Sequence, residues 1–121
     1  MNSPTQRSLE LLREQGYTVA IVEHWNQFAG VRQDLFGFLD IVAIKESERG
    51  VLGVQTTSVN NLSARLGKSL VLKNLKIWLS AGNRYIIHGW GLKGKKGERK
   101  LMACTQKEVT LKDLSAMKFY F

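Results

Sequence analysis

The sequence predicts one α/β domain over residues 1–121, in which a central mixed β-sheet is flanked by helices. Segments with the apolar spacing of helices alternate with short segments rich in β-branched residues, in the order helix, three strands, one or two helices and two strands. Helices packed on a sheet are the layered arrangement that this order favours. A chain with 44% hydrophobic residues is also able to bury one core without disulfides or metals.

The first helix is expected over residues 5–15, because its leucines follow helical spacing and Gly16 provides a stop. Residues 17–25 alternate and are rich in Val and Ile, which predicts the first strand. Residues 26–37 are expected to be a loop, although they include the apolar Val31, Leu35 and Phe36.

The next two strands are expected at residues 38–44 and 51–57, with the polar segment 45–50 as the connection between them. Both are short and rich in β-branched residues, which is typical of paired strands. A symmetric antiparallel hairpin centred on that connection pairs Val42 with Gly53. The register of this hairpin decides which polar side chains meet.

In that register Asp40 lies opposite Gln55, and directly opposed residues have β-carbons about 5 Å apart on the same face. Thr57 joins the same face by the two-residue period of a strand. A carboxylate, a carboxamide and a hydroxyl at one end of a sheet supply oxygen atoms, which suit one hard divalent cation. The sequence therefore predicts a metal site here.

The remaining elements are predicted from the spacing of apolar residues and from residues that begin or end helices. Possible helix caps precede residues 62–66, and a longer helix is expected over 69–81, where apolar side chains occupy about a third of the circumference. Gly82 is expected to end it. Two further strands are expected at 84–90 and 100–105.

The hairpin with a helix on each side resembles the PD-(D/E)XK nuclease superfamily, in particular its small Holliday-junction-resolvase-like and VRR-NUC-type members, over about residues 5 to 90. In that family an Asp opens one strand and an (Asp/Glu)-x-Lys triplet lies on the next. Asp40 matches the first element, and the triplet Gln55-Thr56-Thr57 matches the second in part. Leu39 stands where the family often has Pro, Gln55 where an acid is usual, and Thr57 where Lys is usual.

The resemblance implies a restriction-endonuclease-like core with the order α-β-β-β-α-β. It implies an endonuclease that hydrolyses DNA phosphodiesters with Mg²⁺ or Mn²⁺, acts on branched or replicating DNA and forms a homodimer. Small chains of this type resemble those of bacteriophages and prophages. The alternative is a non-catalytic nucleic-acid-binding protein that kept this scaffold and lost the site, which the Gln-x-Thr sequence favours.

Three side chains are predicted metal ligands. Asp40 interrupts an apolar strand, where an unpaired carboxylate is costly, so it needs a partner; the alternative is a bond to a neighbouring amide or to Arg32. Gln55 offers a neutral oxygen ligand, or else a buried hydrogen bond. Glu23 lies among apolar residues of the first strand and is the preferred third ligand, while Glu10 of the first helix is the alternative acid.

Catalysis by this site needs positive charge near the phosphoryl group. Thr57 can orient a water but supplies no charge. Lys68, in the helix after the hairpin, is predicted to replace the missing lysine; its alternative is an ordinary surface lysine. Arg32 is predicted to contact phosphate, or with Asp34 to structure the loop before Asp40.

The charge is uneven along the chain, which has a net charge of +8: residues 1–60 carry five Lys and Arg against seven Asp and Glu, and residues 61–121 carry thirteen against three. A basic surface favours an anionic partner, and DNA is the leading candidate. The densest cluster lies in a glycine-rich segment whose alternative is a solvated hairpin tip. The predicted phosphate contacts are Arg32, Lys73, Lys76, Lys93, Lys95, Lys96, Arg99 and Lys100.

The sequence lacks the residue patterns of disulfide-bonded, membrane-spanning, zinc-binding and nucleotide-binding proteins. Cys104 is the single cysteine, so no intrachain disulfide forms and a reducing, cytoplasmic location is expected. No signal sequence and no apolar run of about 20 residues is present, so no membrane partner is expected. His24 and His88 lack the spacing of a zinc site and are predicted to be structural, and no glycine-rich nucleotide-binding loop occurs.

Overall fold

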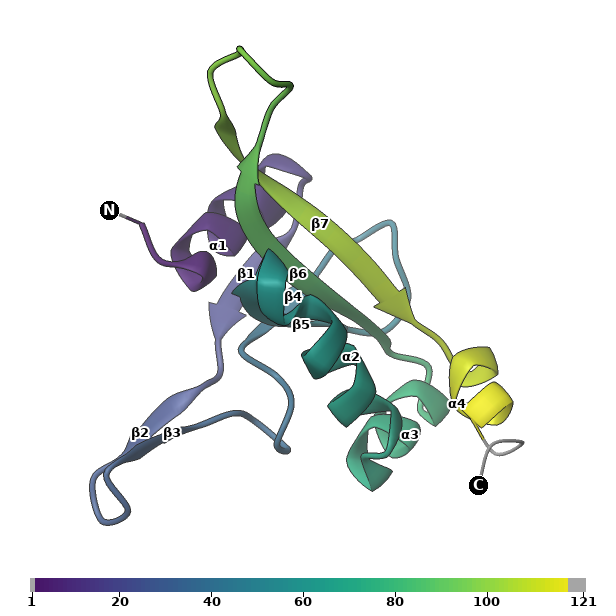
Figure 1. Cartoon of the computed structure of the whole chain (residues 1–121). Coiled ribbons are helices and arrows are strands. Elements are labelled where there is room, and N and C mark those ends of the chain that lie inside the picture. Colours follow the sequence, from purple (N-terminus) through teal and green to yellow (C-terminus); the bar gives the residue numbers. More distant parts are fainter. Residues whose placement is uncertain (1, 118–121) are drawn as a thin grey trace.

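The computed structural model describes residues 2–117, and it confirms the predicted α/β class with a mixed sheet flanked by helices (Figure 1). The elements are, in chain order, α1 (Pro4–Glu14), β1 (Thr18–Ile21), β2 (His24–Asn26), β3 (Val31–Gln33), β4 (Ile41–Ile44), β5 (Leu52–Ser58), the 3-10 helix η1 (Val59–Asn61), α2 (Leu62–Leu70), α3 (Lys73–Ser80), β6 (Arg84–Lys93), β7 (Leu101–Val109) and α4 (Leu111–Met117). Among residues 2–117, no helix combines the length and the apolar character needed to span a bilayer.

The main sheet has five strands in the order β1-β4-β5-β6-β7, and β2 with β3 forms a separate two-stranded sheet. The β5–β6 pair is parallel and the other pairs are antiparallel. The β4–β5 register is the predicted one, because Val42 pairs with Gly53. The ladder ends at the pair of Ile41 with Val54, so Asp40 and Gln55 lie directly beyond it.

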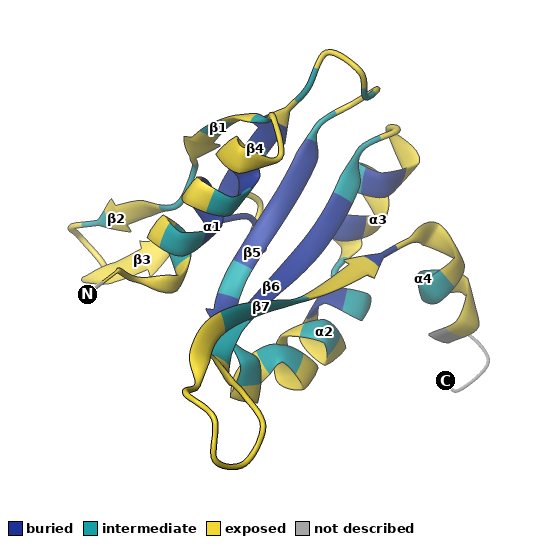
Figure 2. Cartoon of the chain, turned by 90° about the horizontal axis from the view of Figure 1, so that it is seen from above, coloured by how far each residue is buried: buried dark blue, intermediate teal, exposed yellow. Residues whose placement is uncertain are grey.

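Helices cover both faces of this sheet. On one face α1 packs through Leu9 and Leu12 against β4, β5 and β6; on the other, α3 packs through Leu75 and Leu79 against Tyr85 and its neighbours. Strands β5 and β6 are buried over most of their length between these layers (Figure 2). Each fully buried leucine contributes about 1.5–3 kcal/mol, so the two apolar clusters stabilise the central strands.

The prediction for residues 17–37 is wrong in two places. The expected strand 17–25 breaks after β1, where the backbone N–H groups of Val22 and Glu23 donate to the carbonyl of Asp40 at 2.9 and 3.4 Å. The expected loop contains strand β3, which pairs with β2 in a hairpin. The turn of this hairpin is closed because the Asn26 side chain accepts from two following backbone N–H groups. Asn is suited to this role since its side chain bonds backbone amides two or three residues on.

The prediction of one helix over 69–81 is also wrong, because Leu72 has an extended backbone (φ −81°, ψ 120°) that separates α2 from α3. Val71, one of the apolar residues within the predicted helix, is 66% exposed. Gly82 does end α3, with φ +93° and its N–H donating to the Leu79 carbonyl. Strands β6 and β7 are longer than expected, and α4 was not predicted.

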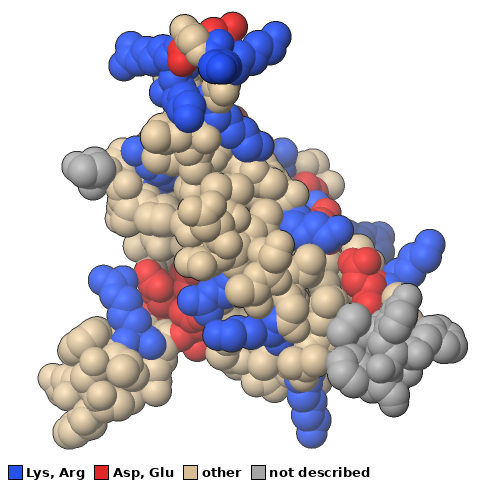
Figure 3. Space-filling view, viewed as in Figure 1, with Lys and Arg blue, Asp and Glu red and all other residues tan. Residues whose placement is uncertain are grey.

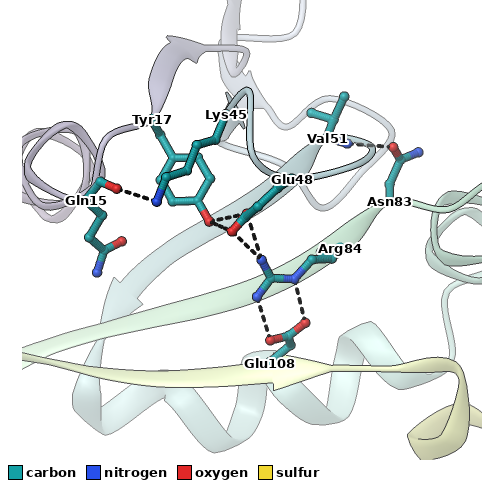
Figure 4. A network of polar contacts seen from close by, with 8 residues as sticks. All are labelled: Gln15, Tyr17, Lys45, Glu48, Val51, Asn83, Arg84 and Glu108. Atoms are coloured by element: carbon teal, nitrogen blue, oxygen red, sulfur yellow. Dashed lines mark hydrogen bonds and ion pairs between the residues drawn. The ribbon is translucent and has the colours of Figure 1, made fainter.

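One end of the sheet is closed by a network of ion pairs and hydrogen bonds, which we call the paired end (Figure 4). Arg84 donates to both carboxylate oxygens of Glu108 at 2.9 and 3.0 Å and to Glu48 at 3.1 Å. The Tyr17 hydroxyl donates to the same Glu48 at 2.6 Å. Each carboxylate in this network therefore has a donor.

Candidate functional site

The opposite end of β4 and β5 is shaped by a tight turn over residues 34–40, which reads Asp-Leu-Phe-Gly-Phe-Leu-Asp. Leu35 and Leu39 pair as an antiparallel bridge, with N···O distances of 2.9 and 3.1 Å. The turn between them needs left-handed backbone at Phe36 (φ 56°) and Gly37 (φ 87°), and glycine supplies the second without strain. The next residues outward in this register are Asp34 and Asp40, which the turn brings together.

A third acid reaches the same point because the chain leaves β1 at the Asp40 backbone. One carboxylate oxygen from each of Glu23, Asp34 and Asp40 lies within 4.8 Å of the others. We call these three residues the acid cluster. The predicted association of Glu23 with Asp40 is thus present, whereas Glu10 is an exposed α1 residue that contacts Asn2.

Asp40 is the buried member of the acid cluster, with 5% of its surface exposed. Its Oδ2 accepts from the backbone N–H of Thr56 at 2.7 Å and from the Thr56 hydroxyl at 3.3 Å. Burial and the nearby Asp34 and Glu23 carboxylates raise the pKa of Asp40 to about 8, although the Thr56 N–H lowers it. A cation in this cluster would favour the ionised form of Asp40 and so lower this pKa.

Gln55 holds the cluster from the β5 side. Its Nε2 donates to Asp34 Oδ2 at 3.3 Å, and its Oε1 accepts from the Tyr85 hydroxyl at 2.6 Å. The oxygen expected to bind a metal is therefore directed to Tyr85, and Gln55 acts on the cluster by positioning Asp34. Asp40 and Gln55 do line one pocket, as the hairpin register predicts.

That pocket has a volume of about 280 Å³ and is mostly polar; its walls are Pro4, Thr5, Glu23, Arg32, Asp34, Asp40, Gln55, Thr56 and Arg65. Arg32 lines the pocket and pairs with Glu23 at 3.0 Å, while its predicted contact with phosphate stays a prediction. The hydroxyls of Thr5 and Thr56 lie 3.0 Å apart and join the start of α1 to the pocket wall.

Arg65 is the residue that sequence reasoning missed. Lys68, which was expected to supply positive charge, lies one turn further along α2, is exposed and does not line the pocket. The helix begins four residues after β5, so its first turn is the part beside the strand end. Thr57 is buried on β5 and does not line the pocket. Asp40 accepts instead from the neighbouring Thr56.

The predicted phosphate contacts are exposed in three places: Arg32 on β3, Lys73 and Lys76 on α3, and Lys93, Lys95, Lys96, Arg99 and Lys100 at the β6–β7 connection. Strand β6 continues past the last residue of β5, so this connection projects beyond the sheet. Figure 3 shows acidic side chains gathered between the β2–β3 hairpin and the body of the molecule, with basic side chains on both sides. The β6–β7 connection with Lys93, Lys95, Lys96, Arg99 and Lys100, which we call the basic tip, lies apart from them.

The arrangement can bind a hard divalent cation through carboxylate oxygens while guanidinium groups face an anion beside it. Neither group requires a large conformational change, since acids and arginines already line one pocket. In comparisons with known proteins, no family model, no curated protein and no solved structure matches this chain.

Proposed function

We propose that this protein is a DNA phosphodiesterase that uses Mg²⁺ or Mn²⁺ held by the acid cluster. The observation that carries the proposal is the convergence of three carboxylates, one of them buried, in a pocket that also contains Arg32 and Arg65. Hard divalent cations prefer such oxygen ligands. Without a cation, the raised pKa of Asp40 keeps its carboxyl group protonated at neutral pH, and a bound cation would replace that proton.

The residues of the pocket suit phosphoryl chemistry. A bound divalent ion would lower the pKa of a water and polarise a phosphodiester oxygen. Arg65 supplies the positive charge that a lysine would otherwise give to the developing phosphorane. The Thr56 N–H holds the Asp40 carboxylate and Gln55 holds that of Asp34, so both acids are oriented before a ligand arrives.

DNA is the proposed substrate because the protein is strongly basic and an anionic polymer can contact several of its basic sites at once. The order of α1, β1, β4, β5, α2 and β6 supports the restriction-endonuclease-like core that the resemblance implies. Branched DNA is the preferred form in this proposal.

One observation favours a second candidate, a nucleic-acid-binding protein without catalysis. No lysine lines the pocket in the part of the chain that the structure describes, and the oxygen of Gln55 is occupied by Tyr85. The metal would then have only the three acids as protein ligands. Cleavage, rather than binding, separates the two candidates.

The test is to incubate the protein with supercoiled, linear and four-way-junction DNA in Mg²⁺, Mn²⁺ or EDTA. We expect metal-dependent cleavage by the wild type, a loss of about 100-fold or more in Asp40→Asn, and DNA binding that survives this substitution. Glu48→Gln, which neutralises an acid at the paired end, is the matched control and should cleave normally.

A wild type that binds DNA but cleaves no form with either metal makes the protein a binding module. Cleavage undiminished in Asp40→Asn places the reaction at another site.

A further inference from the structure

The β2–β3 hairpin projects from the body of the molecule (Figure 1). It carries two exposed aromatic side chains. Phe28 is 95% exposed and Trp25 is 62% exposed, and Val31 beside them is 48% exposed. Single exposed apolar residues are ordinary. Two exposed aromatic rings on one short projecting hairpin indicate a binding surface.

The turn that carries Phe28 is closed by hydrogen bonds. The Asn26 side-chain oxygen accepts from the N–H groups of Phe28 and Ala29, both at 3.0 Å, and the Asn26 carbonyl accepts from Gly30 at 2.8 Å. Gly30 takes the left-handed backbone (φ 68°) that closes such a turn. A partner therefore meets rings that are already presented, with little ordering cost.

The base of the hairpin is part of the acid cluster. Glu23 directly precedes β2 and Asp34 directly follows β3, and the 3.0 Å ion pair between Arg32 and Glu23 joins the two strands there. Trp25 pairs across the hairpin with Arg32, so these two side chains share one face. The aromatic tip is consequently held at a set position relative to the proposed phosphodiesterase pocket.

The chemistry of the tip suits an uncharged flat ligand. Residues 24–31 contain no Lys, Arg, Asp or Glu, so no charged side chain of this segment attracts or repels a phosphate group. A shallow pocket of about 320 Å³ is lined by His24, Trp25, Asn26, Gln27 and Phe28. Aromatic faces stack on nucleobases, and the two amide side chains can bond to base edges.

We propose that the β2–β3 hairpin is a base-stacking finger that binds an unpaired nucleobase of the DNA whose phosphate enters the adjacent pocket. Bases in a continuous duplex are already stacked, so the finger favours single-stranded or branched DNA. This inference rests on the proposed function and adds its substrate preference.

A second copy of the chain is the other ligand to consider for this surface. Two aromatic side chains supply at most about 300–500 Å² of contact, whereas a stable interface needs about 800 Å² from each partner. The small, isolated tip fits one base better than it fits another protein.

The experiment measures affinity by fluorescence anisotropy, in EDTA, for a single-stranded oligonucleotide, the matching duplex and a four-way junction with unpaired bases at its centre. Because stacking on one aromatic ring contributes about 1–3 kcal/mol, Phe28→Ala and Trp25→Ala should each weaken single-strand and junction binding by roughly 5- to 150-fold. Duplex binding should change less than about twofold, since it depends on phosphate contacts.

Two controls separate stacking from general damage. Phe28→Tyr keeps the ring and should bind as the wild type does. Ile44→Ala removes a comparably exposed apolar side chain near the paired end, and it should leave all three affinities unchanged.

A wild type that binds DNA while both alanine variants match it on all three probes overturns the finger and leaves the proposed function standing. An equal loss on duplex and single-stranded DNA also overturns it, as does a dimer that becomes monomeric in Phe28→Ala. A wild type that binds none of the probes overturns the proposed function as well.

Discussion

At the paired end of the sheet, two carboxylates share one guanidinium and a tyrosine hydroxyl, whereas at the acid cluster three carboxylates face one another with one ion pair among them. Both sites lie at the margins of β4 and β5. The Glu108 and Glu48 carboxylates hold the pKa of Arg84 above its usual range, although burial opposes them. At the other end, burial and like charges raise the pKa of Asp40 to about 8.

The contrast separates a structural site from a candidate functional one. At the paired end each carboxylate has a hydrogen-bond donor, so no added ligand is needed to balance its charge. At the acid cluster, burial and the neighbouring acids favour the protonated form of Asp40, and an added cation would favour its ionised form instead. Strongly shifted carboxyl groups in a polar pocket are typical of functional sites, while balanced ion pairs are common on ordinary surfaces.

The largest expected effect is the pH dependence of stability in the metal-free protein. Burial raises the pKa of Asp40 from about 3.9 in the unfolded chain to about 8 in the folded protein. Its contribution to stability is therefore complete below pH 4 and is lost as pH rises through 8. The free energy of unfolding should fall by roughly 4 kcal/mol between pH 5 and 8 relative to Asp40→Asn.

Urea unfolding in EDTA measures this difference, and comparison with Asp40→Asn removes the contributions of all other titrating groups. Parallel pH profiles for the two proteins would mean that the Asp40 carboxyl is not held protonated by its surroundings.

Metal binding should reverse that loss. At pH 8, Mn²⁺ or Mg²⁺ at about 100 times its dissociation constant should stabilise the wild type by about 2.7 kcal/mol, which thermal unfolding detects as a rise in Tm. Asp34→Asn should lose most of this rise because it removes one of the three carboxylates. Glu48→Gln should keep it in full, and an equal rise in Asp34→Asn would show that the metal binds elsewhere.

Breaking the paired end should have a smaller effect, on stability alone. Arg84→Met leaves Glu48 and Glu108 without their shared cation, and we expect a loss of about 1–2 kcal/mol, because the three side chains are each about one-third exposed and screened by water. The loss should shrink at high salt. DNA binding and metal-induced stabilisation should not change, and a variant that lost either would show that the two ends are coupled.

Local patterns explain why much of the fold was predictable. The hairpin of β4 and β5 is symmetric about its connection, so Val42 and Gly53 were placed in register from sequence alone. The break after β1 depends on the carbonyl of Asp40, a contact between residues far apart in the chain. Helical spacing also continues across the kink at Leu72, so periodicity could not locate that break.

The site was predictable in part for the same reason. Asp40 and Glu23 stood out as acids among apolar neighbours, and both belong to the acid cluster. Asp34 was considered only with Arg32, although the symmetry of residues 34–40 about Gly37 was a signal that it lies opposite Asp40. Arg65 had no such signal, because its place depends on how α2 packs beside the end of β5.

Substitutions in the basic tip of the β6–β7 connection should have the smallest effect on stability. They should still weaken DNA binding measurably. Long cationic side chains spaced by glycine suit phosphates of any sequence rather than base edges. Lys95→Ala with Lys96→Ala should reduce the slope of log affinity against log salt by up to about 2 on duplex DNA, at about 0.9 for each lost contact. The affinity loss should be similar for unrelated sequences, and stability should change by less than about 0.5 kcal/mol.

The matched control removes two exposed charges near the paired end, Arg13→Ala with Arg49→Ala. If DNA lies along the acid cluster and the basic tip, which continues beyond the end of β5, this control should keep the wild-type affinity and salt slope. Equal losses in the two double variants would mean that net charge alone attracts the DNA. An unchanged slope in the Lys95 and Lys96 variant would make the tip a solvated turn, and Lys73 and Lys76 on α3 would be the next surface to test.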